Sequence, residues 1–425
     1  MTEATVAAIG LLVFAWAIMS GRLARHNVTG PFLFAAAGYL LGNPDWGPLS
    51  VNVETASIHV VAEITLALVL FSDAARVNVH ELRRDLALPG RLLGIGLLLS
   101  VAAGALIAAW LLTDIPWALA GFVGAALAPT DAALSVQVIN DERIPTRLRR
   151  ALNIESGLND GIVTPIVTVM LAIAASQIGL VTESATSQSG TAVRELAAGV
   201  AVGLVAGAGG ARLITLAARR EWIAEGGRRL AGLAVAISAF AFALDIDANG
   251  FIAAFVAGVA FGASLDTEVA GVERVGELPE LGGQLLALVV WFLFGAALLP
   301  VAFEHSDVRT VAYALLSLTV VRMVPVALSL IRSGLDRPSV LFISWFGPRG
   351  LASVVFALLA IEELGQSSPV VNQAVAAVAL TVMLSVVLHG ITAGPGGRRY
   401  VEHEHPDSEP LPAGPRGFIG ARHRG

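Results

Sequence analysis

Two carboxylates, a hydroxyl group and an amide lie close together near the start of one long apolar segment. Residues 151–175 read ALNIESGLNDGIVTPIVTVMLAIAA and contain Glu155, Ser156, Asn159 and Asp160. Residues four apart share one helix face, so Glu155 pairs with Asn159 along the helix and Ser156 with Asp160. A charge inside a membrane helix costs about 2.5–3.5 kcal/mol on insertion scales. Such a face needs partners or a function, and its oxygen atoms could bind a cation, a proton, or each in turn.

Two other apolar segments are interrupted by a proline beside a charged residue. Residues 121–139 read GFVGAALAPTDAALSVQVI, where Asp131 follows Pro129 closely, and residues 340–359 read VLFISWFGPRGLASVVFALL, where Arg349 follows Pro348. Proline removes a backbone donor and disrupts the preceding helical turn. Two unrelated kinks would explain the pattern, but paired breaks are typical of the transport site of a secondary transporter.

These residues suggest a division of roles. Arg349 is the obvious partner for Glu155, because an arginine stays charged. A structural ion pair between them would leave Asp160 free to titrate or to bind a cation. Carbonyl groups near Thr130, together with Asp131 and the Ser156 hydroxyl, would supply further oxygen ligands. The plainer alternative is that Asp160 is a buried carboxylate satisfied by hydrogen bonds.

Composition identifies an integral membrane protein. The 425 residues are 56% hydrophobic and 14% charged, with a mean hydropathy of +0.75, whereas soluble domains are about 25% charged. The chain has no cysteine and no lysine, so all 27 basic residues are arginines. Disulfides and cysteine-based metal sites are therefore excluded.

The glycine-rich stretch at 207–212 lies in an apolar helix, where Gly203 and Gly207 would let two helices approach closely. We expect no cofactor and no nucleic-acid partner.

Thirteen segments are long and apolar enough to be candidate membrane helices. Their approximate ranges are 4–20, 28–42, 55–72, 89–112, 116–139, 148–176, 191–217, 228–245, 249–264, 281–302, 309–328, 338–361 and 369–392. The loops after odd-numbered helices, with the adjoining helix ends and the tail, hold 22 arginines, and the loops after even-numbered helices with their adjoining helix ends hold two. Under the positive-inside rule this places the N-terminus outside and the C-terminus in the cytoplasm.

We therefore predict an all-α polytopic membrane protein of 13 transmembrane helices, with a membrane domain at 1–392 and a disordered cytoplasmic tail at 393–425. The interrupted helices, the fifth and the twelfth, are seven apart and so run in opposite directions. That arrangement indicates two inverted repeats, helices 1–6 and 8–13, with the broken helices crossing at the centre.

The sequence resembles the NhaP-like monovalent cation:proton antiporters of the cation:proton antiporter-1 family. The resemblance covers about 4–392, and its motifs are LFSDAARVNVHELRRD at 70–85, PTDAA at 129–133, ESGLNDG at 155–161 and GPRGLASVVFALL at 347–359. It implies that Asp160 binds the cation and the proton, and that Thr130, Asp131 and Ser156 are co-ligands. Glu155 would pair with the arginine of the second broken helix, here Arg349.

The resemblance also implies a role for two more residues and an assembly. Asp73 matches an acid at the cytoplasmic end of the third helix, where relatives often have glutamate. Asn159 stands where the electrogenic branch usually has a second acid, which favours electroneutral one-for-one exchange. Family members are homodimers. Glu63 and Arg322, also inside spans, are left without a settled role: Glu63 could line a funnel, and Arg322 could snorkel or pair with a core acid.

The resulting prediction is a plasma-membrane antiporter that exchanges Na⁺, or else K⁺ or Li⁺, for H⁺ by alternating access. Asp160 would bind cation or proton in competition. The alternatives are a cation channel or passive pore and, from a different class, an intramembrane hydrolase in which Asp131 and Asp160 share a water molecule. We expect a transporter rather than an enzyme.

Overall fold

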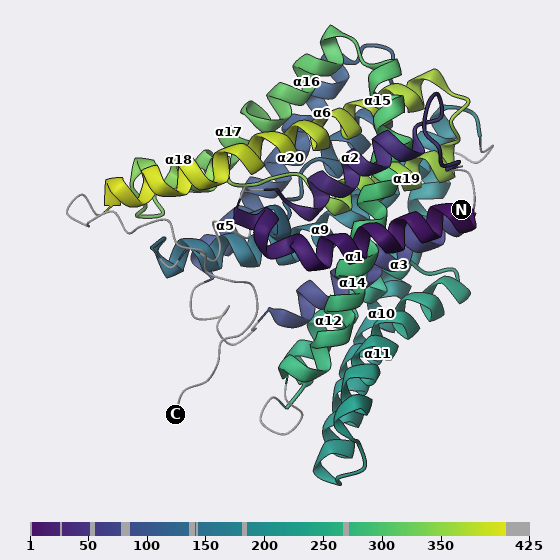
Figure 1. Cartoon of the computed structure of the whole chain (residues 1–425), viewed down its shortest axis with the longest axis vertical. Coiled ribbons are helices and arrows are strands. Elements are labelled where there is room, and N and C mark those ends of the chain that lie inside the picture. Colours follow the sequence, from purple (N-terminus) through teal and green to yellow (C-terminus); the bar gives the residue numbers. More distant parts are fainter. Residues whose placement is uncertain are drawn as a thin grey trace.

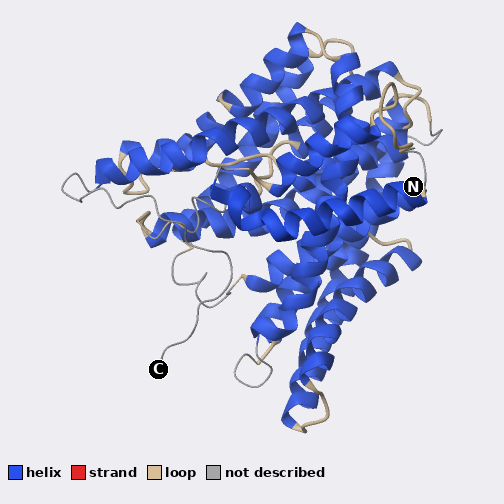
Figure 2. Ribbon diagram, viewed as in Figure 1, coloured by secondary structure: helices blue, strands red, loops and turns tan. Residues whose placement is uncertain are grey.

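The computed structural model describes residues 2–25, 28–51, 56–77, 86–135, 141, 143–180, 185–266 and 272–404. Within these ranges all regular elements are helices (Figures 1 and 2). In chain order they are α1 (Glu3–Arg25), α2 (Gly30–Gly42), α3 (Ala56–Arg76), α5 (Ala87–Arg91), η1 (Leu92–Gly96), α6 (Leu97–Leu111), α7 (Trp117–Ala126), η2 (Ala132–Ser135), α9 (Thr146–Gln177), α10 (Ala185–Arg219), α11 (Glu225–Asp245), α12 (Gly250–Ser264), α14 (Val272–Leu293), η3 (Phe294–Leu298), α15 (Leu299–His305), α16 (Val308–Leu318), α17 (Val320–Ser329), α18 (Arg337–Trp345), α19 (Leu351–Leu364) and α20 (Pro369–Glu404).

The predicted all-helical, multi-pass membrane fold is confirmed. Each of the thirteen expected ranges overlaps a helix or a run of joined helices. In the described part of the chain, nine stretches are long and apolar enough to cross a bilayer unaided, while α2, α7 and α12 are shorter apolar helices. The number of thirteen crossings therefore stays a prediction, because a span of roughly 20 residues is the usual requirement.

The helices form two groups that meet along α3. In Figure 1, α10, α11 and α12 lie side by side in the lower part of the view, whereas α6, α16, α17, α18 and α20 occupy the upper part. Helix α3 contacts α12 and α14 on one side and α9 and α19 on the other. It therefore packs against both α9, which carries Asp160, and the lower group, and α9 also contacts α10 and α12 directly.

Glycines set the close packing of α10 on α12, as the spacing of Gly203 and Gly207 predicted. A Cβ atom at Gly203 would come within 2.7 Å of the Ala253 carbonyl oxygen, and one at Gly207 would overlap the backbone of Ala257. Small residues at such a seam let two backbones approach where lipid provides no hydrophobic drive for association.

Both expected interruptions are present. α7 ends at Ala126 and regular structure resumes only with η2 at Ala132, so residues 127–131 are non-helical around Pro129. α18 ends at Trp345 and α19 starts at Leu351, which leaves the FGPRG segment, 346–350, non-helical and buried. Irregular backbone at membrane depth is tolerated only where protein or a water-lined cavity surrounds it, so these two segments mark a site.

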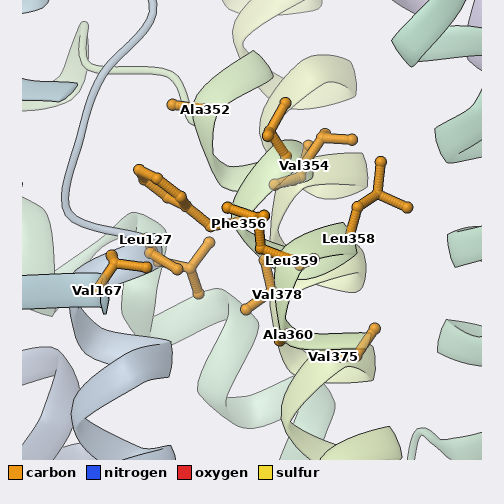
Figure 3. Packing of buried hydrophobic residues seen from close by; sticks show 14 of the residues in the cluster. Leu127, Val167, Ala352, Val354, Phe356, Leu358, Leu359, Ala360, Val375 and Val378 are labelled. Atoms are coloured by element: carbon orange, nitrogen blue, oxygen red, sulfur yellow. The ribbon is translucent and has the colours of Figure 1, made fainter. Parts of the chain in front are cut away.

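Helix α19 lies at the centre of the main hydrophobic cluster. Figure 3 shows its side chains packed among residues of the α7 break, α9 and α20. The labelled members are Leu127, Val167, Ala352, Val354, Phe356, Leu358, Leu359, Ala360, Val375 and Val378. Eleven of its positions from Leu351 to Ile361 are buried without interruption. The second half of the broken helix is thereby fixed on all sides.

The expected tail boundary at residue 393 falls inside a helix. Helix α20 continues to Glu404 through Gly394 and Pro395, and the remaining tail, 405–425, lies outside the described residues. The added turns pack on α18: the Tyr400 hydroxyl group lies 2.7 Å from Ser339 Oγ, and its ring is 4.5 Å from that of Phe342. Tertiary packing thus overrides the low helix propensity of glycine and proline.

Candidate ion-binding site

The first break is tied to α9 through Thr130. The Thr130 hydroxyl group lies 3.1 Å from Ser156 Oγ. The Asn159 amide donates to Thr130 Oγ1 at 2.8 Å and to the Thr130 carbonyl oxygen at 3.2 Å. Helical spacing places Ser156 and Asn159 within one turn, so both reach the same loop residue. Three of the predicted site residues are thus in direct contact.

The second break reaches the first through Arg349. Its guanidinium Nη1 donates to the carbonyl oxygens of Ala128, at 2.8 Å, and Pro129, at 3.2 Å. These carbonyl groups belong to the non-helical segment just past the end of α7, where no helical N–H is available to them. A buried guanidinium at this position also complements the negative end of the α7 dipole.

Asp131 bonds backbone groups of the second break and of α19. Its backbone N–H donates to the Pro348 carbonyl oxygen at 2.9 Å. Its carboxylate accepts from the Leu351 N–H at 3.1 Å and from the Ala133 N–H at 2.7 Å. Asp131 therefore caps the first turn of α19 from another helix. Gly350 makes room for it, because a Cβ atom there would overlap the Asp131 carboxyl group.

The expected ion pair between Glu155 and Arg349 is replaced by another. Glu155 Oε1 accepts from Arg322 Nη1 at 2.5 Å, and both side chains are almost completely buried. Arg322 lies on α17, just after the kink at Thr319, and Gly347 leaves space for its guanidinium group. Arg349 is directed to carbonyl groups instead, so each buried arginine has its own acceptor.

Asp160 is the carboxylate left over. Its Oδ1 atom is buried and has no hydrogen-bond partner in the described part of the chain, and the same holds for Asn159 Oδ1. Asp131 and Asp73 are the acids that act on it electrostatically. Asp73 lies on α3 with its backbone oxygen 3.6 Å from where a Cβ atom of Gly157 would be. All six residues predicted to bind the ion or proton therefore gather where α3, α9 and the first break meet.

Residues 8–397 match the family model described as "Sodium/hydrogen exchanger, transmembrane". The chain belongs to the sodium/hydrogen exchanger family. This family membership covers both broken helices and every residue of the site described above.

Relatives within this family include antiporters named for K⁺. The chain is 27% identical to the K(+)/H(+) antiporter NhaP of Alkalimonas amylolytica over 83% of its own length, and 24% identical to the K(+)/H(+) antiporter NhaP2 of Shewanella baltica over 82%. It spans about 60% of the length of these relatives. The sodium proton antiporter MjNhaP1 of Methanocaldococcus jannaschii has the same fold, with a TM-score of 0.79, 19% identity and coverage of 93% of this chain and 98% of that one.

Some residues around the site were assigned little or no role from the sequence. Arg322 lies well inside the expected span 309–328, which is a signal, but spacing does not reveal which acid an arginine meets. Ser385 accepts from the Arg349 N–H at 2.7 Å, and the Ser353 hydroxyl group donates to the Ala126 carbonyl oxygen at 2.6 Å. Serines in apolar helices are common enough that only the structure singles these out.

Proposed function

We propose that this chain is a secondary transporter, not an enzyme, that exchanges a monovalent cation for a proton. The observation that supports this most directly is the buried Asp160 oxygen, which has no hydrogen-bond partner among the described residues and lies beside two broken helices. A buried carboxylate is costly when it is unpaired. Either a proton or a cation stabilises it, and binding of one opposes binding of the other.

The surrounding groups support a cation site of oxygen ligands. Asp160 would supply the charge, and the hydroxyl groups of Thr130 and Ser156, with Asp131 behind them, would supply neutral and charged oxygens. Unwound backbone and half-helix ends are where secondary transporters coordinate Na⁺ and H⁺. Asp73, on α3, would face the ion from the other group of helices.

The proposed stoichiometry is one cation for one proton, and the exchange is electroneutral. Asp131 is occupied as a cap of α19, and Glu155 is paired with Arg322. Asn159 donates its amide to Thr130, so it holds the loop and carries no charge. Asp160 is then the carboxylate that would exchange one charge for another, with Asp73 facing it from α3.

Alternating access would require the helices around the breaks to move against the lower group along α3. We further propose a homodimer in the plasma membrane, with the N-terminus outside and the C-terminus in the cytoplasm, as the arginine distribution predicts. Na⁺ is the expected cation. The names of the K⁺ antiporters among the relatives favour K⁺ as the second candidate, and Li⁺ is the third.

The test is exchange in proteoliposomes. Purified protein is reconstituted with a pH-sensitive dye inside, and gradients of Na⁺, K⁺ and Li⁺ are applied in turn across pH, with and without a clamped membrane potential. The substitution Asp160→Asn removes the exchanging charge, and Asp245→Asn, at an exposed carboxylate at the end of α11, is the matched control.

We expect wild-type protein and Asp245→Asn to show cation-driven proton movement that Asp160→Asn lacks. Normal exchange by Asp160→Asn would refute the site. Exchange driven by potential alone would refute the electroneutral stoichiometry. Cation flux without opposing proton flux would favour the passive pore over the antiporter.

A further inference from the structure

A buried histidine on α20 lies directly behind the second break. His389 is 2% exposed, and its ring stacks on that of Trp345 at 5.1 Å between centroids. Its Nε2 atom is 3.0 Å from the Trp345 carbonyl oxygen, the last of α18. Its Nδ1 atom lies 3.2 Å from Ser385 Oγ and 3.0 Å from the Ser385 carbonyl oxygen. The ring therefore joins one end of the break to the helix behind it.

These contacts hold the ring from both sides. A carbonyl oxygen only accepts, so Nε2 carries a proton when it bonds the Trp345 carbonyl oxygen. Nδ1 lies within hydrogen-bond distance of two Ser385 atoms, the hydroxyl oxygen and the carbonyl oxygen. The Ser385 hydroxyl oxygen also accepts from the Arg349 N–H. The ring and the Arg349 backbone therefore meet at the same hydroxyl group.

We propose that His389 is a positioning residue for the transport site. It orients Ser385, Ser385 holds the Arg349 backbone N–H, and the Arg349 guanidinium holds the Ala128 and Pro129 carbonyl groups beside Thr130. The backbone at the first break is thus fixed by a chain of hydrogen bonds that starts on α20. This inference rests on the proposed cation exchange at Thr130 and Asp160 but adds a residue that touches neither ion.

The geometry distinguishes this role from simple packing. Leucine fills much of the space of histidine but offers no hydrogen bond, whereas asparagine is smaller but places an acceptor near the position of Nδ1. A packing role predicts that His389→Leu is better tolerated than His389→Asn. A positioning role through Ser385 predicts the reverse.

The experiment compares the apparent KM for the cation with the maximal rate in proteoliposomes, at equal reconstituted protein. We expect His389→Leu and Ser385→Ala each to raise KM by about five- to tenfold, the effect of losing one buried hydrogen bond. His389→Asn should keep KM within about twofold of wild type. The double variant His389→Leu/Ser385→Ala should have a KM no higher than that of Ser385→Ala alone, because both residues act on one chain of contacts.

The matched control is His305→Leu. His305, on α15, also places Nδ1 near the carbonyl oxygen four residues earlier, at 3.2 Å from Val301, but lies beside no break. We expect its KM to be unchanged. Unchanged KM in His389→Leu, or a larger effect of His389→Asn than of His389→Leu, would overturn the proposal.

A second measurement separates this inference from the proposed function. Hydrogen exchange of the peptide covering 346–351 is followed by mass spectrometry in detergent, where no transport is needed. We expect its amides to exchange about five- to tenfold faster in His389→Leu than in His389→Asn or wild type. Equal amide protection in His389→Leu and wild type would refute the positioning role, even if the wild-type protein transports cations. A wild-type protein that transports no cation against protons would refute the proposed function alone.

Discussion

Arg322 and Arg349 are both buried near Glu155, yet they stabilise different groups. Arg322 forms an ion pair with Glu155, whereas Arg349 donates to carbonyl groups just past the end of α7. The difference follows from their backbones. Arg349 lies inside the break and reaches across to the other break, and Arg322 comes from a regular helix that faces α9. The Glu155–Arg322 pair therefore links α9 to α17, and Arg349 links the two broken helices.

Removing the charge of Glu155 should destabilise the protein strongly. Glu155→Gln leaves the Arg322 guanidinium buried without an anion, and breaking a buried pair from one side typically costs about 3–5 kcal/mol. The double variant Glu155→Gln/Arg322→Met removes both charges and should recover much of that loss. Melting temperatures in detergent measure the effect.

The matched control for this buried pair is an exposed ion pair on α11. Glu225 lies 3.0 Å from Arg229 on the surface of α11, and Glu225→Gln should change stability by less than about 1 kcal/mol. The buried pair would not stabilise the core if Glu155→Gln melted at the same temperature as the control. The same would hold if the double variant melted at a lower temperature than Glu155→Gln.

At the scale of elements, the two broken helices complete each other. Each broken helix supplies groups that the other lacks: Asp131 caps the start of α19, Ser353 of α19 bonds the last carbonyl oxygen of α7, and Arg349 bonds the carbonyl oxygens just past it. Termini of helices leave several backbone groups without partners, and in a bilayer no water replaces them. Neither broken helix could therefore be stable at this depth alone.

Gly350→Ala tests this reciprocity. The added Cβ would overlap the Asp131 carboxyl group and push it away from the Leu351 N–H. We expect exchange to fall at least tenfold, roughly the effect of losing a charge-assisted hydrogen bond, while helix content by circular dichroism is kept. Gly390→Ala on α20, where a Cβ would meet open space, is the control. Full exchange by Gly350→Ala would mean that Asp131 need not cap α19.

The sequence predicts these elements unevenly, for physical reasons. Pro129 and Pro348 predict the breaks, because the missing backbone N–H is a property of the proline itself. The choice of partner depends on residues far apart in the sequence. The sequence therefore predicts Arg349 as the partner of Glu155, whereas Arg322 forms that ion pair in the structure. The π-helical turns η1 and η3 have no composition signal from which a sequence analysis could predict them. Asp160 was identified early because an unpaired membrane carboxylate is costly in any context.

At the scale of the whole molecule, α20 connects the site to the end of the described chain. Its middle holds the second break through Ser385 and His389, and its last turns pack with α18 and the start of α9. That cluster consists of Leu88, Leu92, Ile144, Leu148, Ala151, Leu152, Val326, Leu330, Phe342, Ile343, Phe346, Ala393, Tyr400 and Val401. Sequence alone placed the domain boundary before this contact, because Gly394, Pro395, Gly396 and Gly397 normally end a helix.

Two truncations locate the true boundary of the domain. A chain that stops after Glu404 keeps the cluster and should melt like the full-length protein. A chain that stops after Thr392 loses Ala393, Tyr400 and Val401 and should melt at a lower temperature. In the full chain, Tyr400→Phe removes the hydroxyl group that bonds Ser339 and should cost about 0.5–1.5 kcal/mol. If both truncated chains melted alike, the end of α20 would be dispensable, and the membrane domain would end near residue 392 as the sequence first suggested.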